Sequence, residues 1–283
     1  LAKLPELCSA AHAHGINVLL DIVTNHVGQL FYYDINLNGT PDVAVYGTGT
    51  TSTVTRVTEY DPDWDPRGIQ AFTSLGEAGP APVVWLFEPA INRIAPGPAA
   101  FADPTFYHRN GRILDFADPV QRELGAFPGG LKDLATEDGR VRAALIDAFA
   151  YWMDAADIDG YRIDTVKHVE HEFWREFAPA LRRHAREIGK TSFFMFGEVF
   201  DGDDALVGSY TLNEELDSVF YFPQRFRVID GVLKSGGPTT AVRTLYDERT
   251  THYATAPVAD GTGVAAASQL VGFLDNHDLA RFL

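Results

Sequence analysis

Three carboxylates stand at the ends of predicted strands, where side chains from distant parts of the chain can meet. Asp164, Glu198 and Asp278 lie at or near the ends of three different predicted strands. Close carboxylates repel each other unless a cationic neighbour or a cationic transition state compensates. The three residues are therefore either parts of one site or unrelated strand-end acids, and their spacing alone leaves both interpretations open.

The neighbours of Asp164 and Glu198 predict different protonation states for the two groups. Arg162 lies two residues before Asp164, hence on the same side of the strand, where it can keep Asp164 ionised. Glu198 follows the apolar run 193–197, which would raise its pKa toward that of a general acid. An ionised nucleophile beside a protonated acid is what retaining glycoside hydrolysis requires, and a third anion can stabilise its cationic transition state.

A helix-then-strand unit recurs along the chain and would position these residues. Apolar residues at helical spacing predict helices, two of which should end at Gly15 and Gly189. The strands are expected, in order, at 16–23, 158–166, 192–199, 217–222 and 269–275. Such strands, separated by helices, predict a parallel sheet that helices cover.

The polar residues at the strand ends favour a (β/α) barrel over an open sheet. In a barrel the carboxyl ends of the strands converge on one face, where the site is built. An open doubly wound sheet usually carries a Gly-rich phosphate turn, which this sequence lacks. Residues 28–139 interrupt the pattern and are too many for a loop, so they predict an inserted subdomain.

Composition excludes several classes of partner. The 283 residues include 23 Lys and Arg against 39 Asp and Glu, for a formal net charge of −16. Such a surface repels phosphate backbones and anionic lipids, which argues against nucleic acid and membrane partners. No apolar run approaches the roughly 18 residues of a membrane helix. A neutral substrate or a cation suits this charge better, and the oligomeric state cannot be read from the sequence.

Four segments resemble the signature segments of the α-amylase family, glycoside hydrolase family 13, in the family's order. They are DIVTNH at 21–26, GYRIDTVKH at 160–168, GEV at 197–199 and FLDNHD at 273–278. A fifth, LKDL at 131–134, resembles the segment that closes the family's inserted domain B.

The resemblance implies an α/β fold, a (β/α)8 TIM barrel that is partial here, from about strand 3 to strand 7. Residues 1–27 would hold helix 2 and strand 3, residues 28–139 domain B, and residues 140–283 helix 3 to strand 7. We expect the rest of the barrel and the usual C-terminal β domain to be absent, and the chain to be a fragment.

The resemblance also implies roles for individual residues. Asp164 would be the nucleophile, Glu198 the acid/base, and Asp278 the carboxylate that holds and distorts the sugar. Substrate contacts would come from His26, Arg162, Lys167, His168 and His277. Ca²⁺ would be held by the side chains of Asn25 and Asp133 and the backbone carbonyl of His168, and all-oxygen ligation suits calcium.

The expected activity is retaining endo-hydrolysis of α-1,4-glucosidic bonds in starch-like glucans and maltooligosaccharides. The pair Lys167-His168 favours the α-amylase and cyclodextrin glucanotransferase side of the family. Gly129, four residues before Asp133, offers no ring around which a glucan could cyclise, although Phe127 lies only two residues away. Hydrolysis is therefore favoured over transglycosylation, and the size of the substrate predicts a secreted or periplasmic protein.

Two non-enzymatic alternatives stay open. Some amylase-like proteins act as binding or transporter-accessory subunits, but these are expected to lack at least one of the three carboxylates, and all three are present here. A truncated, inactive fragment is the other alternative, because five strands of eight would leave two open sheet edges.

Overall fold

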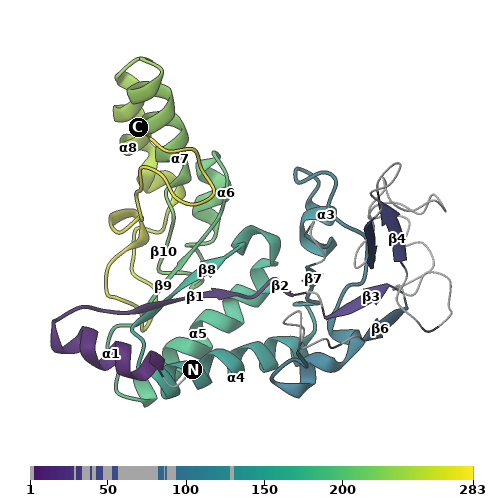
Figure 1. Ribbon diagram of the computed structural model, residues 1–283. Coiled ribbons are helices and arrows are strands. Elements are labelled where there is room, and N and C mark those ends of the chain that lie inside the picture. The colour runs from purple at the N-terminus through teal and green to yellow at the C-terminus, as the bar shows by residue number, and fades with distance from the viewer. Residues whose placement is uncertain are drawn as a thin grey trace. The chain divides into compact units, whose positions relative to one another are not determined.

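The computed structural model describes residues 3–28, 30–33, 39, 43–46, 53–56, 82–85, 87, 94–127 and 131–282. Gly129 lies outside these residues. The chain divides into two compact units (Figure 1). Unit 1 comprises Leu1–Thr24 and Leu145–Leu283, and unit 2 comprises Asn25–Ala144. The predicted limits of domain B, residues 28 and 139, stay predictions.

Unit 1 is built on a parallel sheet of four strands, β1 (Leu19–Val23), β8 (Gly160–Asp164), β9 (Phe194–Gly197) and β10 (Ser218–Val219). The strands are adjacent in chain order, β1-β8-β9-β10, as the predicted barrel requires. A parallel bridge between Phe220 and Val271 extends the order by one further segment. Among the described residues the sheet does not close on itself.

Helices accompany these strands in the predicted alternation. Their bounds are α1 Lys3–Ala13, α4 Gly139–Ala156, η4 Val166–His168, α5 His171–Glu187, α6 Asp204–Ser209, α7 Phe222–Gln224, η5 Arg225–Lys234, α8 Thr240–His252 and η6 Ala266–Ser268. The two predicted glycine stops are confirmed, because Gly15 and Gly189 follow α1 and α5 with φ of 70° and 85°. None of the helices within the described ranges is long and apolar enough to cross a membrane.

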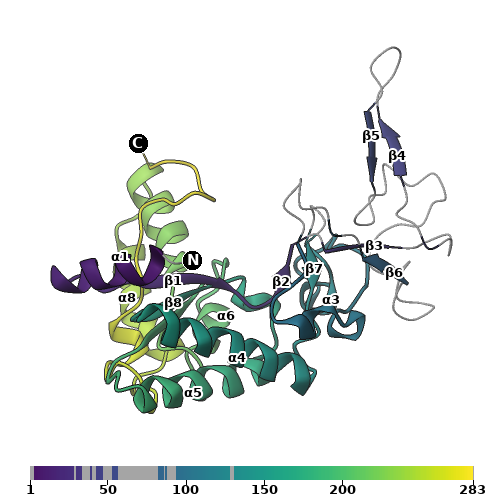
Figure 2. The same ribbon diagram turned by 60° about the horizontal axis from the view of Figure 1, so that its bottom comes forward.

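Aromatic side chains join α4 and α5 to the sheet. The Phe149 ring on α4 lies 5.8 Å from Tyr161 on β8 and 5.8 Å from Phe177 on α5, both nearly edge-on. On α5, the buried residues Phe173, Phe177 and Leu181 recur at helical spacing. Figure 2 shows the two helices side by side along the sheet. This packing fixes the strands whose ends carry the predicted catalytic residues.

The last two predicted strands differ from expectation. The run 217–222 gives only the two-residue β10, because Phe222 and Pro223 already begin α7. The run 269–275 contributes only the bridge at Val271. There the Gln269 side chain donates to the backbone carbonyls of Asp217 and Val264, so a side chain replaces ladder hydrogen bonds. The helix at 225–234 is a π-helix, whose period the apolar pattern did not predict.

Within its described residues, unit 2 contains three antiparallel strand pairs. These are β2 (His26–Val27) with β7 (Lys132–Asp133), β3 (Phe31–Tyr33) with β6 (Val83–Trp85), and β4 (Val43–Tyr46) with β5 (Thr53–Arg56). The same part of the chain includes the short helices η2 (Ala99–Ala102), η3 (Pro104–Phe106) and α3 (Pro119–Leu124). The β2–β7 register places His26 opposite Asp133.

A buried ion pair ties α5 to the sheet. The side chains of Arg182 and Asp217 are 1% and 0% exposed, and their charged atoms lie 3.5 Å apart. Arg182 also donates to the carbonyls of Glu214 and Glu215, and Asp217 accepts from the backbone of Met195. Each charge is therefore compensated inside unit 1.

Replacing Arg182 with alanine should lower the free energy of unfolding by about 3–5 kcal/mol, because the Asp217 charge would stay buried without its partner. Denaturant titration followed by circular dichroism measures this loss. The control is Arg183→Ala, which removes an exposed arginine from the same helix and should stay within about 0.5 kcal/mol of the parent. Equal losses in both variants would contradict the expectation.

Candidate active site

The strand register brings Arg162 to the centre of three carboxylates. In the β1–β8 pair, Asp21 stands opposite Arg162 and Val23 opposite Asp164. Because side chains two residues apart share one face of a strand, Arg162 and Asp164 point to the same side. Glu198 follows the neighbouring strand β9, and its backbone N–H donates to the carbonyl of Ile163 at 2.7 Å.

One guanidinium holds these carboxylates together. Arg162 Nη1 donates to Asp164 Oδ1 at 2.7 Å and to Asp21 Oδ1 at 2.9 Å, and Nη2 donates to Glu198 Oε2. Its side chain is 13% exposed, and it lies over the ring of Phe220 at 5.8 Å. The predicted residues Asp164, Glu198 and Arg162 are thus brought together from two strands.

Asp21 was missed by the sequence reasoning as a partner of Arg162. Its side chain is 61% exposed. It belongs to the segment 21–26, in which the resemblance implies roles for Asn25 and His26 alone. The missing information was the register between β1 and β8, which places residue 21 beside residue 162. We interpret Asp21 as a positioning residue that orients the guanidinium.

Glu198 has the environment of a general acid, with a pKa raised toward neutral pH. Burial raises its pKa to about 7, the Arg162 guanidinium opposes this rise, and Asp164 and Asp278 add to it. The apolar surroundings predicted from residues 193–197 are present, since Phe193, Met195 and Phe196 are all buried.

Asp278 and His277 lie on the last described segment of unit 1. Their side chains are 45% and 77% exposed, and His277 Nε2 lies 3.1 Å from Asp278 Oδ2. The Asn276 side chain accepts from the backbone of Asp278 and Leu279, which orders this turn. Within the described residues, Asp278 acts on Glu198 through its charge and is not one of the hydrogen-bond partners of Arg162.

Lys167 is tied to the loop that follows the candidate acid. Its ammonium donates to the carbonyl of Phe200 at 2.5 Å and to Asp201 Oδ2 at 3.2 Å. The Phe200 side chain is an exposed aromatic two residues beyond Glu198, and its ring packs 4.7 Å from Phe222. The sequence reasoning did not select Phe200, because a single aromatic next to a motif carries no periodic signal.

In unit 2 the predicted residues His26, Asn25 and Asp133 form one hydrogen-bonded chain. Asn25 Nδ2 donates to Asp133 Oδ1 at 2.9 Å, and Asn25 Oδ1 lies 3.0 Å from His26 Nδ1. The other Asp133 oxygen is bound by His108 Nδ1 at 2.5 Å, and His108 Nε2 lies 2.9 Å from Glu137. His108 and Glu137 were not found from the sequence, since no spacing rule links them to residue 133.

The charges in this chain compensate each other. Burial raises the pKa of Asp133 to about 6, while the bond from His108 opposes that rise. Burial lowers the pKa of His108, but its bonds to Asp133 and Glu137 outweigh burial and raise the pKa to about 10. At pH 7 the carboxylate of Asp133 therefore faces an imidazolium.

Asn25 and Asp133 carry oxygen donors of the kind that calcium takes, but in this structure the Asn25 NH2 group and His108 Nδ1 face the two Asp133 oxygens. An amide and a carboxylate are hard donors, and ligating carboxylates commonly accept further hydrogen bonds, as Asp133 does from His108. The third predicted ligand, the carbonyl of His168, belongs to unit 1. Across the described part of the chain, no group of three or more His, Cys, Asp and Glu residues converges as a metal site.

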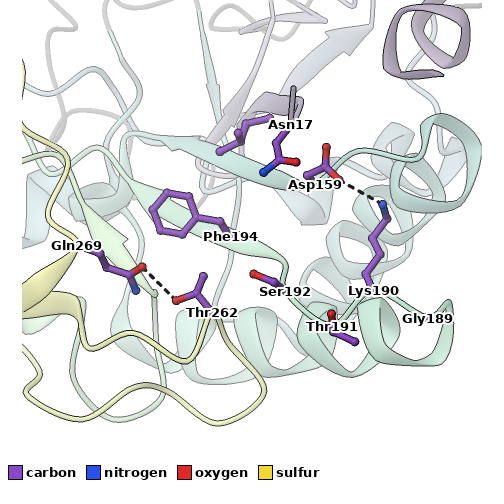
Figure 3. Close-up of a pocket in the computed structure, with 10 residues that line it drawn as sticks. Asn17, Asp159, Gly189, Lys190, Thr191, Ser192, Phe194, Thr262 and Gln269 are labelled. Carbon is purple, nitrogen blue, oxygen red and sulfur yellow. Dashed lines mark hydrogen bonds and ion pairs between the residues drawn. The ribbon is translucent and has the colours of Figure 1, made fainter. Parts of the chain in front are cut away.

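A separate pocket of about 520 Å³ opens in unit 1 at the amino-terminal ends of the strands (Figure 3). Leu19 and Phe194, the first residues of β1 and β9, line it together with Asn17, Asp159 and Lys190. None of the predicted site residues lines this pocket. It lies at the end of the sheet opposite to Asp164 and Glu198.

Asp164→Asn should lower the pKa of Glu198 from about 7 toward the usual glutamate value of about 4.3, because it removes a neighbouring negative charge. A carbon-13 NMR titration of the Glu198 carboxyl measures this. Asp147→Asn, an exposed substitution on α4, should leave the pKa unchanged. An unchanged or higher value in Asp164→Asn would contradict the assigned contact.

Comparisons with known proteins place this arrangement in a family. A family model described as "Alpha amylase, catalytic domain" matches residues 121–283. The chain is 30% identical over 293 residues to an α-amylase of Streptomyces lividans. This alignment covers 98% of this chain and 28% of that protein. It is 27% identical over 191 residues to a cyclomaltodextrin glucanotransferase of Klebsiella oxytoca, covering 64% and 27% of the two chains.

Among solved structures, the α-amylase of Geobacillus thermoleovorans complexed with acarbose is similar, with a TM-score of 0.63 and 25% identity. The match covers 99% of this chain and 45% of that one, so the chain spans less than half the length of these relatives. The likeness confirms the predicted (β/α)8 barrel class, to which the parallel sheet of unit 1 contributes. The family model matches more than half of the residues, and the chain belongs to the α-amylase family.

Proposed function

We propose that this protein is a retaining endo-hydrolase of α-1,4-glucosidic bonds in starch-like glucans and maltooligosaccharides. The observation that carries the proposal is the single guanidinium of Arg162 between Asp164 and Glu198, with the pKa of Glu198 raised to about 7. This arrangement places a carboxylate that is paired with a guanidinium beside a carboxyl group of raised pKa, and double displacement uses such a pair as nucleophile and acid.

In the first step, a carboxylate oxygen of Asp164 attacks the anomeric carbon as the bond to the leaving oxygen breaks. Glu198 donates its proton to that oxygen, so the departing glucan leaves as a neutral alcohol. In the second step, Glu198 takes a proton from water while the water oxygen attacks the anomeric carbon and displaces Asp164. Two inversions restore the α-configuration.

The proximity of the two carboxylates supports retention over inversion. Asp164 and Glu198 bind the two terminal nitrogens of one guanidinium, so their carboxyl groups are close. Retaining enzymes need about 5–5.5 Å between these groups, whereas inverting enzymes need about 6.5–9.5 Å to admit a water molecule. In this proposal, Asp278, His277 and His26 hold the sugar at the point of cleavage, and Lys167 and His168 line the leaving-group side.

The choice of an α-glucan rests on the family and on the chemistry around the acid. The similar Geobacillus enzyme was solved with acarbose, and the Streptomyces relative is an α-amylase. A neutral glucan suits a chain with a formal charge of −16. The exposed ring of Phe200, two residues beyond Glu198, can pack against the apolar face of a sugar. Glucans of this size suggest a secreted or periplasmic protein.

Transglycosylation is the second candidate, with a sugar hydroxyl in place of water in the second step. Phe127 favours it, because this ring packs 5.2 Å from His26 and lies two residues from the position where a cyclising aromatic is expected. The glucanotransferase of Klebsiella oxytoca is among the relatives. Hydrolysis stays the first candidate because position 129 itself is glycine.

The proposal retains residues 28–139 as domain B, between the barrel segments 1–27 and 140–283.

The proposal also includes calcium as a structural ion. Asn25 and Asp133 would hold the ion, with the carbonyl of His168 as the predicted third ligand. The ion would add positive charge beside the buried carboxylate of Asp133, which burial otherwise disfavours. No catalytic step depends on it.

The protein should release linear maltooligosaccharides as α-anomers from soluble starch, and Asp164→Asn should reduce kcat at least about 10³-fold because the nucleophile is lost. Chromatography and proton NMR of fresh products measure both outcomes. Asp147→Asn is the matched control and should keep full activity. Cyclic or lengthened products would favour the transferase, and a folded protein without turnover on any α-glucan would contradict the substrate.

Calcium should raise Tm relative to a chelator. At a concentration one hundred times Kd, a bound ion adds about 2.7 kcal/mol, which corresponds to roughly 5–10 °C for a chain of this size. Differential scanning calorimetry measures the rise, which Asp133→Asn should abolish and Asp147→Asn should retain. Identical curves with calcium and with chelator would contradict the calcium proposal.

A further inference from the structure

One face of the Arg162 guanidinium is in contact with an aromatic ring. The terminal nitrogens of the group donate to Asp164, Asp21 and Glu198. The guanidinium carbon lies over the ring of Phe220, 5.8 Å from its centroid. The N–H groups of an arginine all lie in one plane, so hydrogen bonds hold the edge of the guanidinium, whereas a stacked group holds its face. Phe220 is such a group.

Hydrogen bonds alone hold this guanidinium incompletely. Its Nη1 is shared by Asp164 and Asp21, whereas Nη2 binds Glu198. Asp21 is 61% exposed, so water competes for its contact. A guanidinium held only at its edge can turn about the Nε–Cζ bond, which exchanges Nη1 and Nη2 between their partners. A ring packed on the face stands in the path of that turn, and cation–π attraction is stronger where the cation is shielded from water, as Arg162 is.

The strand order places Phe220 on the side of Glu198 away from Asp164. In the pairing of β10 with β9, Val219 stands opposite Gly197, and the Phe220 N–H continues the pairing by donating to the Gly197 carbonyl at 2.9 Å. On the other side of β9 lies β8, which ends at Asp164. The candidate acid therefore has the candidate nucleophile on one side and an aromatic residue on the other.

The Phe220 ring is itself held in place by other rings. The Phe196 ring lies 5.0 Å away with an interplanar angle of 82°, and the Phe273 ring lies 5.3 Å away at 67°. Edge-to-face contacts of this kind favour one orientation of the ring. The backbone of Phe220 also forms a parallel bridge with Val271. The guanidinium therefore packs on a ring whose own position is fixed.

We infer that Phe220 is a positioning residue that holds the Arg162 guanidinium between Asp164 and Glu198. The inference rests on the roles that the proposed function gives to those three charged residues. Phe220 acts through Arg162 and transfers no proton. It keeps one terminal nitrogen on the nucleophile and the other on the acid while the sugar binds and leaves. A variant without the ring would keep the three charged residues but lose their fixed arrangement.

Nitrogen-15 NMR of the arginine side chains tests this inference without substrate or turnover. A guanidinium that turns slowly about its Nε–Cζ bond gives separate Nη1 and Nη2 signals, and one that turns rapidly gives an averaged signal. The protein is labelled with nitrogen-15 arginine, and the Arg162 signals are assigned through Arg162→Lys. They should be separate in the parent and in Phe220→Tyr, which keeps the ring. They should be averaged in Phe220→Leu, which is apolar but has no ring face.

The kinetics of maltooligosaccharide hydrolysis give a second readout. Phe220→Leu should lower kcat about 10-fold and change KM by less than about 2-fold, because the placement of the reacting groups counts for more in the transition state than in substrate binding. Phe220→Tyr should keep kcat within about 2-fold of the parent, because the ring face is retained.

The matched control is Phe194→Leu, which makes the same change on the same face of β9. The Phe194 ring stacks on Phe196 at 5.3 Å, and within the described residues it is not a contact of Arg162. This variant should keep the Arg162 signals separate and kcat within about 2-fold of the parent. Circular dichroism melting curves show whether each variant is folded.

Separate Arg162 signals together with an unchanged kcat in folded Phe220→Leu would overturn the inference. Averaged signals in the parent, in Phe220→Tyr or in Phe194→Leu would also overturn it, because the ring face of Phe220 would then not be what holds the guanidinium. Signals that follow the ring in a parent protein without turnover on any α-glucan would support the positioning and contradict the proposed function.

Discussion

The guanidinium of Arg162 is the interaction on which the candidate active site of unit 1 depends. It binds the carboxylates of Asp164, Asp21 and Glu198 from a position that is largely buried. Burial raises the pKa of Glu198 to about 7, and the Arg162 guanidinium opposes this rise. Asp164, on the neighbouring strand, has the same guanidinium as its partner. A single cation thus binds two carboxyl groups that lie in different surroundings.

The parallel sheet is what makes this arrangement possible. Neighbouring parallel strands end at the same edge, so residues separated by more than one hundred positions in the chain, such as Asp21 and Arg162, become direct neighbours. The helices α4 and α5 pack on this sheet through aromatic contacts, and α5 is also joined to it by the buried Arg182–Asp217 pair. The residues that pack the core are therefore different from the charged residues of the candidate site, which lie at the carboxyl ends of the strands.

In unit 2 a different cation compensates a buried carboxylate. The carboxylate of Asp133 faces the imidazolium of His108, and the Asn25 amide contacts both Asp133 and His26. The amide of Asn25 can make both contacts because it has one donating and one accepting end.

The order of helices and strands, the family and the catalytic candidates could all be predicted from the amino-acid sequence, because each of these depends on local pattern. Apolar periodicity, glycine stops at residues 15 and 189, and polar residues at strand ends are all readable within short windows. The short strands after residue 217 and the π-helix at 225–234 were not predicted, because side-chain bonds such as those from Gln269 and a change of helical period leave no local apolar pattern.

The partners of each charged group, in contrast, became known from the three-dimensional fold. Asp21 gains its role from the register of β1 against β8, and His108 gains its role from a contact with Asp133, 25 residues further along the chain. Neither contact leaves a periodic trace in the sequence. A local pattern reports which face of an element is buried, whereas the partner of a charge depends on which elements the fold brings together.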